Sequence, residues 1–436
     1  MPDSATTHSA TTVDVNKHQP SDPGSRDSIV IIGAGLAGCA LAYILAAKGK
    51  HVTIIDSAND VATAASGNTA ALLRPHITRD DNLASRFSAS GFIETLAVID
   101  NLARSQKTDK QSVFTSCGAL HLLQQPDAYP EHALYQRLSK ESAQALTHFP
   151  LASGGLYYPD AGYVNLPSLC QQLRQQPLID FFGDSHVESI EQKGNLWFIR
   201  CHNTSYEALR VVLANGTNIS NFNTMHELTL QPVHGQTTCI EAPDNQLKVA
   251  VCGQRTIIPI RNQSTDQQPL WQIGATYNRQ NQDAASNDPI DQDNRDNLQA
   301  AAQLLNSSEE LTHVGGGSPP DLFETSKIHS HWSATRATTP DRLPVVGPVP
   351  DFDFYHKHYH DLHHGKAERH YPDAEYLSGL FVLGGLGSRG VSSAFIAARL
   401  LADQILKRTV DPVDHDFYTL LHPARFLIRR LKRNGN

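Results

Sequence analysis

The chain has 436 residues, of which 40% are hydrophobic and 18% charged, and its net charge is −8. These values are typical of a globular protein with room for two domains. The acidic balance excludes a generally basic nucleic-acid coat and leaves room only for a local basic patch. The six cysteines form no CxxC pair, so we expect reduced thiols and a cytoplasmic location. No segment has the length of an apolar membrane span, and we expect no membrane contact.

The N-terminal segment is polar. Residues 1–27 are rich in Ser, Thr, Asp and Pro and lack the apolar core of a signal peptide. We therefore expect these residues to be a disordered tail without a targeting role.

A complete βαβ pattern follows the tail. Residues 28–32 are a short β-branched run, residues 36–48 have helical periodicity, and residues 51–55 are apolar again. This order predicts two parallel strands joined by a helix.

Glycines fill the turn between the first strand and this helix. Gly33 allows the tight turn, Gly35 lets the backbone approach a pyrophosphate, and Gly38 lets the helix pack closely on the strand. The helix N-terminus supplies donors for phosphate oxygens. Asp56, at the end of the second strand, is placed to bind ribose hydroxyls. The unit therefore predicts a dinucleotide-binding site.

The middle of the chain mixes helices and strands. A small-residue loop at residues 64–75 either follows a surface that needs close backbone approach or is a simple connector. Helices are predicted over residues 83–104 and 131–148, and strands over residues 118–123 and 196–201. Residues 209–216 predict a buried parallel strand that ends in a glycine turn, an arrangement that brings ligand contacts to a sheet edge.

A second GxGxxG occurs at residues 385–390. A strand at 380–383 precedes it and a helix at 391–406 follows, but no further strand with a terminal acid comes after. We therefore interpret it as a closing βα unit whose helix N-terminus reaches the cofactor of the first motif. A reductase that carries both FAD and NADPH is less expected than a flavoenzyme oxidised by another acceptor.

Two arginines are candidate ligands of a carboxylate. Arg336 lies in a turn-rich segment before the closing strand, and Arg389 lies in the second glycine-rich turn. A guanidinium is a planar, permanently charged fork that matches a carboxylate. The alternative is a structural ion pair or a solvated side chain, for which Asp341 is the expected internal partner.

Two further segments carry positive charge or histidine. The basic residues near the C-terminus are spaced for one face of a helix, which is either a phosphate-binding tail or a solvated helix end; they are Arg425, Arg429, Arg430, Lys432 and Arg433. Residues 354–376 contain six of the 22 histidines. Their spacing fits no structural zinc pattern with cysteines, so we expect a flexible surface loop and no metal site.

The order of these motifs resembles the D-amino-acid oxidase superfamily, which binds FAD. The resemblance rests on the first glycine motif and on residues 65–68, 232–236, 336–347 and 384–390. Within the superfamily the chain is most similar to the FAD-dependent half of the MnmC family of bifunctional tRNA-modifying enzymes. That similarity covers residue 28 to the C-terminus, with matches at residues 211–216, 274–277, 335–351, 386–390 and 420–432.

The resemblance implies an α/β fold of the glycine oxidase type. A Rossmann-like FAD-binding domain is expected at residues 28–90, 151–225 and 331–436, and a second, mainly antiparallel β substrate domain at residues 91–150 and 226–330. The residues expected to bind FAD are Gly33, Gly35, Gly38, Asp56, Ser66, Gly67, Asn68, Val187, Asn215, Gly216, Gly385, Gly387, Ser388, Arg389 and Gly390.

The resemblance also implies a reaction at the wobble uridine of tRNA. A 5-carboxymethylaminomethyl group, which is an N-alkylated glycine, is oxidised to an imine that hydrolyses to an aminomethyl group and glyoxylate. Oxygen is the expected acceptor for reduced FAD. Arg336 and Arg389 match the positions that hold the substrate carboxylate in related glycine oxidases. A small-molecule glycine or sarcosine-type amine oxidase and a noncatalytic FAD-binding assembly protein remain alternatives.

The chain departs from the family in two ways. Nothing in residues 1–27 matches the methyltransferase half, so we expect a separate methyltransferase as a partner besides the tRNA substrate. Relatives carry a tyrosine before the strand at Pro259, where this chain has Thr256 flanked by Arg255. We therefore expect Tyr277 to take the catalytic role of that tyrosine.

Overall fold

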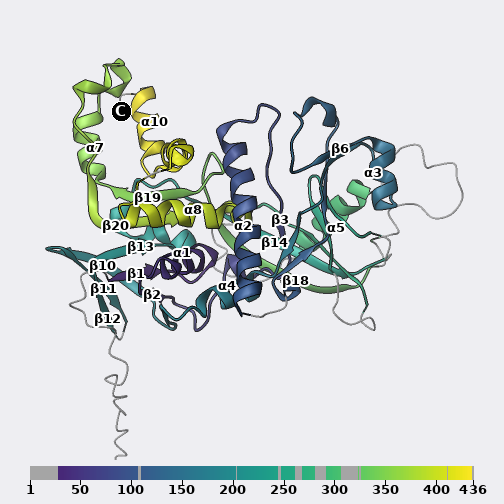
Figure 1. Ribbon diagram of the computed structural model, residues 1–436, viewed down its shortest axis with the longest axis horizontal. Coiled ribbons are helices and arrows are strands. Elements are labelled where there is room, and N and C mark those ends of the chain that lie inside the picture. The colour runs from purple at the N-terminus through teal and green to yellow at the C-terminus, as the bar shows by residue number, and fades with distance from the viewer. Residues whose placement is uncertain are drawn as a thin grey trace, which may run out of the picture.

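Two large sheets organise the molecule (Figure 1). The computed structural model describes residues 28–106, 110–202, 204–243, 247–260, 268–279, 291–305, 323, 326–409 and 411–434. The tail expected at residues 1–27 lies outside the described residues. Figure 1 shows one sheet with the C-terminal helices on one side of the molecule and the other sheet on the opposite side, with a long helix, α2, between them.

The first sheet is mostly parallel. Its strands, in sheet order, are β19 (Val345–Pro350), β20 (Tyr376–Gly384), β13 (Arg210–Leu213), β1 (Ile29–Ile32), β2 (Val52–Ile55) and β9 (Ile179–Phe182). Only the edge strand β19 runs antiparallel to its neighbour. The side chains of β1 alternate between two apolar cores, with Ile29 and Ile31 in one and Val30 and Ile32 in the other. Burial on both faces explains why this strand is entirely apolar.

Helices cover one face of this sheet, and a small sheet and helices cover the other. The first core includes residues of α1 (Leu36–Ala47), α4 (Leu166–Arg174) and α8 (Gly390–Ile405). The second core contains residues of the helices α7 (Phe352–Tyr359) and α10 (Arg425–Asn434) and of the strand β11 (Leu196–Cys201). Strand β11 is the middle strand of a small sheet, between β10 (Val187–Lys193) and β12 (Ser205–Ala208).

The second large sheet has eight strands. In sheet order they are β18 (Ile328–Thr338), β14 (Gln231–Glu241), β17 (Leu270–Gly274), β16 (Thr256–Ile260), β15 (Ala250–Cys252), β5 (Ala119–Leu122), β7 (Gly155–Tyr158) and β6 (Gln136–Leu138). All neighbours are antiparallel except the β15–β5 pair. Two helices, α3 (Lys140–Thr147) and α5 (Asp291–Leu305), contribute to its core.

The helix α2 (Leu83–Gln106) packs along α8. A Cβ at Gly91 would overlap the carbonyl oxygen of Ser392, so the two helices are in backbone contact there. A second small sheet, of β3 (Ala71–Leu73), β8 (Gly162–Val164) and β4 (Phe114–Ser116), and the helix α9 (His415–Leu421) complete the sheets and α-helices of the described ranges. Within these ranges no helix combines the length and apolarity that crossing a membrane requires.

The two-sheet fold expected from the resemblance is confirmed, but two local predictions are wrong. Residues 131–148 are not one helix, because residues 136–138 pair with β7 and α3 begins only after Ser139, whose Oγ accepts from the Ser142 amide. Residues 354–376 are not a loop throughout, because residues 354–359 belong to α7, whose buried rings of Phe352, Tyr355 and Tyr359 lie in the second core. The expected domain boundaries remain a prediction; α2 runs across residue 90, and β18 runs across residue 331.

Candidate FAD and substrate site

The glycine-rich turn after β1 packs against two other segments. Gly33 has a φ of +111°, and a Cβ there would lie 2.6 Å from the backbone of Ala214 at the end of β13. A Cβ at Gly38 would overlap the carbonyl oxygen of Gly33. The positive φ of Gly33 fits the tight turn predicted there, and the backbone contact at Gly38 fits the close packing predicted for that glycine.

Two polar side chains hold the turn beside the start of α1. Asp56 accepts from the amide of Ala34 through Oδ2 (2.6 Å) and from the amide of Ala58 through Oδ1 (2.9 Å). Ser66 Oγ accepts from the amide of Leu36 at 2.9 Å. The loop that contains Ser66 is thereby fixed against the N-terminus of α1, where a phosphate would bind.

A cavity of about 650 Å³ extends from this turn to the eight-stranded sheet. Most of the residues predicted to bind FAD line it: Gly33, Gly35, Asp56, Ser66, Asn68, Asn215, Gly216, Gly385, Gly387, Ser388, Arg389 and Gly390. Gly38, Gly67 and Val187 do not. Gly38 packs inside the turn, and a Cβ at Gly67 would overlap the ring of Trp332.

The residues around the cavity fit a dinucleotide such as FAD. Gly33 and Gly35 line the cavity at the start of α1, where a pyrophosphate would lie, and Asp56 lies at the carboxyl edge of β2. Asn215 Oδ1 is buried, and no described residue hydrogen-bonds to it, so it is free to bind a ligand. The closing turn at residues 385–390 lines the same cavity, as predicted for a single cofactor held by both ends of the chain.

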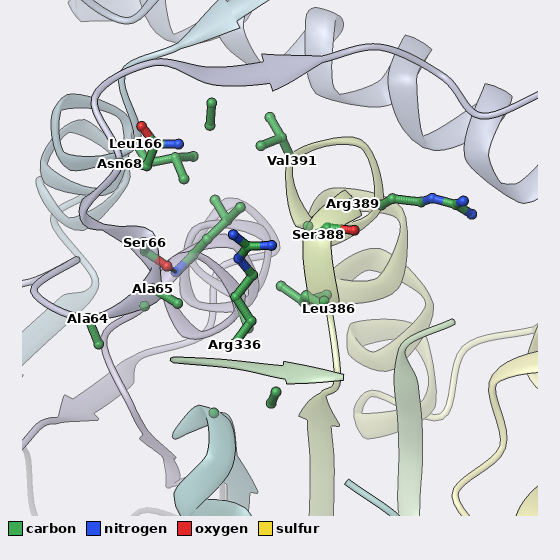
Figure 2. A pocket seen from close by; sticks show the side chains of 18 of the residues that line it. Ala64, Ala65, Ser66, Asn68, Leu166, Arg336, Leu386, Ser388, Arg389 and Val391 are labelled. Carbon is green, nitrogen blue, oxygen red and sulfur yellow. Dashed lines mark hydrogen bonds between the residues drawn. The ribbon is translucent and has the colours of Figure 1, made fainter. Parts of the chain in front are cut away.

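Arg336 lies on β18 opposite Val233 of β14 and lines the cavity. In Figure 2 its side chain rises between the segment of Ala65 and Ser66 on one side and Leu386 on the other. A Cβ at Gly235 would overlap Arg336 Nη2, so this glycine makes room for the guanidinium. Burial lowers the pKa of Arg336. Among the described residues its guanidinium has no carboxylate and no hydrogen-bond partner.

A buried polar network supports the two strands behind Arg336. His234 Nε2 lies 2.6 Å from Ser333 Oγ, which joins β14 to β18. Asp293 of α5 lies 3.7 Å from His234 Nδ1 and accepts from Thr276 Oγ1. All four residues are less than a tenth exposed, so they hold the strands in register and do not themselves reach a substrate. This network was not predicted from the sequence.

Arg389 also lines the cavity, but in Figure 2 its side chain extends away from Arg336. Burial, followed by the charges of Arg342 and Arg74, lowers the pKa of Arg389 to about 10. Burial and the same three arginines lower the pKa of His76 to about 4. Arg74 and His76 were not predicted as site residues, although Arg74 lies at the end of the small-residue loop of residues 64–75 and His76 directly follows it.

Tyr277 lies at the cavity with 43% of its surface exposed. The Arg279 guanidinium is 5.5 Å from the centre of its ring. Burial raises the pKa of Tyr277, but hydrogen bonds with Arg279 and Thr338 outweigh this effect and lower it. Thr256 and Arg255 line the same cavity. The structure therefore brings Tyr277 to the site, and its catalytic role stays a prediction.

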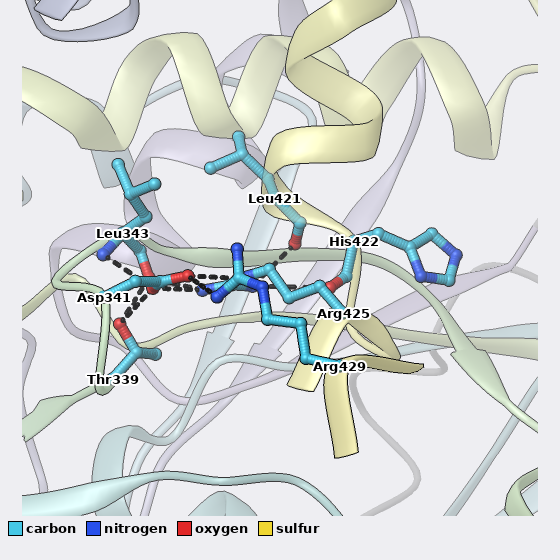
Figure 3. Close-up of polar contacts among 7 residues, drawn as sticks. All are labelled: Thr339, Asp341, Leu343, Leu421, His422, Arg425 and Arg429. Carbon is cyan, nitrogen blue, oxygen red and sulfur yellow. Dashed lines mark hydrogen bonds and ion pairs between the residues drawn. The ribbon is translucent and has the colours of Figure 1, made fainter. Parts of the chain in front are cut away.

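The basic residues near the C-terminus are mostly occupied within the protein. Arg425 is 6% exposed, and it donates to Asp341 through Nε (3.0 Å) and Nη2 (2.9 Å) (Figure 3). Arg429 Nη1 donates to the same carboxylate, and Arg430 pairs with Glu227. The expectation that Asp341 is the partner of Arg336 is therefore wrong. Arg425 is also not part of a phosphate-binding tail, because it is buried.

Lys432 and Arg433 remain exposed at the end of α10. The histidines of residues 356–364 lie on or just after α7, and most are exposed. Nowhere in the described ranges do three or more His, Cys, Asp or Glu side chains gather as ligands for a metal ion. All six cysteines are buried free thiols.

The chain is similar to curated bacterial proteins along nearly its whole length. Three are named "tRNA 5-methylaminomethyl-2-thiouridine biosynthesis bifunctional protein MnmC". The protein of Ectopseudomonas mendocina (strain ymp) is 30% identical over 94% of this chain and 61% of its own length. The protein of Pseudomonas fluorescens (strain Pf0-1) is 32% identical over 94% of this chain and 60% of its own length. The protein of Legionella pneumophila (strain Corby) is 26% identical over 95% of this chain and 60% of its own length. The chain thus spans about three fifths of these relatives.

Solved structures share the fold at lower identity. Glycine oxidase from Geobacillus kaustophilus superposes with a TM-score of 0.67 at 19% identity, covering 91% of this chain and 98% of that one. Iminodiacetate oxidase (IdaA) from Chelativorans sp. BNC1 superposes with a TM-score of 0.66 at 18% identity, and the match covers 89% of this chain and 98% of that one.

The family of FAD dependent oxidoreductases called DAO matches residues 28–404, which include the glycine turn, Asp56, Arg336 and most of the closing unit. The match agrees with the dinucleotide cavity that these residues line. The chain therefore belongs to the DAO family of FAD-dependent oxidoreductases.

Proposed function

We propose that this protein oxidises the 5-carboxymethylaminomethyl group of a wobble uridine in tRNA, giving the 5-aminomethyl group and glyoxylate. The names of its relatives support a role in the biosynthesis of 5-methylaminomethyl-2-thiouridine in tRNA. The methyl group in that name is added to an amine, so a methyltransferase activity is the expected partner in the reaction sequence.

The observation that carries the proposal is the Arg336 guanidinium. It lies at the cofactor cavity, it is partly buried, and no carboxylate among the described residues neutralises it. A charged group in such a place is stabilised by an anionic ligand. The carboxylate of an N-alkylated glycine is a ligand of matching shape and charge.

In the proposed oxidation, residues of this chain position the substrate carbon that lies between the amine and the carboxylate. FAD, when bound, accepts a hydride from the carbon between the amine and the carboxylate, and hydrolysis of the resulting imine gives glyoxylate and the primary amine. Arg336 would hold the carboxylate at one end of that carbon. Gly235 and the His234–Ser333 bond keep Arg336 in place. Tyr277 lies at the cavity and is partly exposed, so its phenol would contact the substrate amine or the uracil base.

The proposal is tested by anaerobic mixing of the FAD-loaded protein with three reductants. These are free glycine, free sarcosine, and tRNA from a strain blocked at the carboxymethyl stage. Bleaching of the flavin by this tRNA and not by the amino acids is the expected result. Bleaching by the amino acids alone would instead identify a small-molecule amine oxidase, and no bleaching at all would favour a noncatalytic FAD-binding protein.

The Arg336→Ala variant tests the carboxylate site. We expect the variant to retain yellow FAD and to lose flavin reduction by about 100-fold, because a misplaced substrate carbon costs roughly that much. Arg200→Ala, at an exposed arginine of β11, is the matched control and should behave as the wild type. Loss of FAD together with activity would show that Arg336 is structural.

A further inference from the structure

One rim of the cavity, at the ends of β16 and β17, carries two arginines and a tyrosine. Arg255 lies in the turn between β15 and β16 and lines the cavity, as does Tyr277 in the segment that follows β17. The antiparallel pairing of β16 with β17 begins at Thr256 and Gly274, so Arg255 and Tyr277 both lie just beyond the same end of these strands. The Arg279 guanidinium lies 5.5 Å from the centre of the Tyr277 ring. We call Arg255, Tyr277 and Arg279 the rim residues.

The helix α5 holds Arg255 in place. Arg255 Nε donates to Oδ1 of Asn297 at 3.1 Å, and Arg255 Nη1 donates to the carbonyl oxygen of Gln254 at 3.4 Å. Asn297 is fully buried, and its Nδ2 donates to the carbonyl oxygen of Gln236 and to Thr238 Oγ1. Because these bonds fix the amide of Asn297, that amide in turn fixes the orientation of the Arg255 guanidinium.

The two arginines of the rim have no counter-ion within the described part of the protein. Neither Arg255 nor Arg279 forms an ion pair with a carboxylate there, in contrast to Arg399, which pairs with both Glu94 and Asp414. Arg279 is exposed and Arg255 is partly exposed, so both guanidinium groups can reach a bound ligand.

The lining of the cavity has the same excess of positive charge, although the whole chain has a net charge of −8. The arginines that line it are Arg74, Arg255, Arg336 and Arg389, and the only carboxylate of the lining within the described ranges is that of Asp56. Asp56 lies on the cofactor side and accepts from two backbone amides. A local excess of positive charge in a cleft attracts an anionic substrate.

Neither of the anions already assigned to the cavity accounts for the rim. The pyrophosphate of a dinucleotide binds at the N-terminus of α1. Arg336, which would hold the substrate carboxylate, lies on β18, and β14 and β17 separate β18 from β16. Three strand spacings of about 4.8 Å place the backbone of Arg336 roughly 14 Å from the turn of Arg255. Arg279 lies outside the lining of the cavity. A carboxylate at Arg336 therefore leaves the rim for another anionic group of a larger substrate.

We propose that Arg255 and Arg279 bind the phosphates of an RNA substrate next to the modified nucleoside, and that Tyr277 stacks on a base of the same strand. This inference rests on the proposed function and names residues that distinguish a nucleotide in RNA from free glycine. Guanidinium groups bind phosphate oxygens through paired hydrogen bonds. The ring of Tyr277 is 43% exposed between the two arginines along the chain, and such rings stack on unpaired bases.

The binding experiment uses the FAD-loaded protein and a fluorescent anticodon stem-loop RNA with an unmodified uridine at the wobble position. This RNA carries no group to be oxidised, so fluorescence anisotropy measures its affinity without turnover. Arg255→Gln and Arg279→Gln should each weaken binding about tenfold and lower the slope of log Kd against log salt by about one. Tyr277→Ala should weaken binding about tenfold, whereas Tyr277→Phe keeps the ring and should retain most of the affinity. Arg200→Gln, at an exposed arginine of β11, is the control and should bind as the wild type does.

A second measurement separates a phosphate contact from a general loss of the site. The free nucleoside 5-carboxymethylaminomethyluridine has no phosphate, and the concentration dependence of anaerobic flavin reduction gives its apparent Kd. The proposal expects Arg255→Gln to raise the Kd of the RNA far more than the apparent Kd of the nucleoside. Arg255→Lys, which keeps the charge, should restore most of the RNA affinity and so excludes a merely structural effect of Arg255→Gln.

The outcomes distinguish this inference from the proposed function. If Arg255→Gln and Arg279→Gln bind the RNA as the wild type does, or if Arg200→Gln loses as much affinity as they do, the inference is refuted even when the modified RNA bleaches the flavin. Equal losses of RNA and nucleoside in Arg255→Gln would likewise overturn the phosphate contact. If the rim variants weaken RNA binding as expected and the modified RNA does not bleach the flavin, the inference stands and the proposed reaction fails.

Discussion

Arg336 shows how one side chain depends on the residues around it. Its guanidinium occupies the space beside Gly235 that a Cβ would fill, and the buried His234–Ser333 bond joins the two strands at this point. The glycine is therefore a steric requirement of the arginine, and both are needed to present a positive charge to the cavity.

A first prediction concerns Gly235→Ala. The new methyl group would displace the Arg336 guanidinium, so flavin reduction by the substrate should fall by about 100-fold. FAD content should not change, because Gly235 does not line the cavity. Anaerobic stopped-flow absorbance measures the rate, and the flavin spectrum measures the content.

The double variant Gly235→Ala/Arg336→Ala provides the control. If Gly235 acts only through Arg336, the double variant should be no slower than Arg336→Ala alone. Additive losses would contradict this explanation and indicate a separate effect, for example through the Thr276 carbonyl, which would lie 2.8 Å from the new Cβ.

At the scale of elements, Asp341 connects the turn after β18 to the C-terminal helix α10. Its carboxylate accepts from both Arg425 and Arg429, and Arg425 also donates to the carbonyl oxygens of Leu343 and Leu421 (Figure 3). Burial raises the pKa of Asp341, but the hydrogen bonds from these arginines outweigh burial and lower it. One acid thus fixes α10 against the segment that carries Arg336 and Arg342.

A second prediction follows for Asp341→Asn. The change leaves the buried charge of Arg425 without its counter-ion, so the free energy of unfolding should fall by about 2 to 4 kcal/mol. Glu227→Gln is the matched control, since it removes the partner of the exposed Arg430 and should cost less than about 1 kcal/mol. Urea unfolding measures both variants, and equal losses would contradict the distinction between a buried and an exposed pair.

At the scale of the whole molecule, the cavity belongs to neither sheet alone. The strands β1, β2 and β13 end at the cofactor side of the cavity, while β16, β17 and β18 supply the side that contains Thr256, Gly274 and Arg336.

Buried histidines add a pH dependence to the stability of the fold. Burial, followed by the charge of Arg425, lowers the pKa of His422 to about 4.

A third prediction is acid destabilisation in the range of histidine titration. His76, His121 and His422 have pKa values of about 4, 3 and 4 in the folded chain, against about 6.5 when unfolded. The unfolded state therefore binds more protons below pH 6.5, so stability is complete above that pH and is lost as the pH falls toward 4. The loss for His422 is at most about 3 kcal/mol.

Thermal unfolding at a series of pH values measures this effect. The Tm should decrease between pH 6.5 and 5, above the range in which most carboxyl groups titrate. In His422→Gln the decrease should be smaller, because protonation at Nδ1 would otherwise break the bond from the Ala424 amide. A Tm that stays constant from pH 7 to 5 would contradict the prediction.

Much of the fold could be predicted from local patterns, as the residues around Gly33 show. The strand, helix and strand predicted at residues 28–55 are observed within two residues of their expected ends. The closing strand and helix around residues 385–390 are likewise observed. The prediction for residues 131–148 failed because a short segment there pairs with β7, and such pairing overrides helical periodicity.

The site was predicted less completely, and the errors concern charge pairing. Asp341 was predicted to pair with Arg336, five residues before it, but its partner Arg425 lies 84 residues after it in the chain. Arg74 received no role, because nothing near it in the sequence indicates that its charge acts on Arg389, 315 residues along the chain.

The sequence by itself determined the cofactor site. Its glycines, helix and acid lie within some thirty residues, and close packing leaves few other residue types possible at Gly33 and Gly38. Only the tertiary structure decided which arginines face the cavity and which are neutralised inside the protein. The physical reason is that a charge is stabilised by whatever group lies within a few ångströms, and the packing of the two sheets brings those groups together from distant parts of the chain.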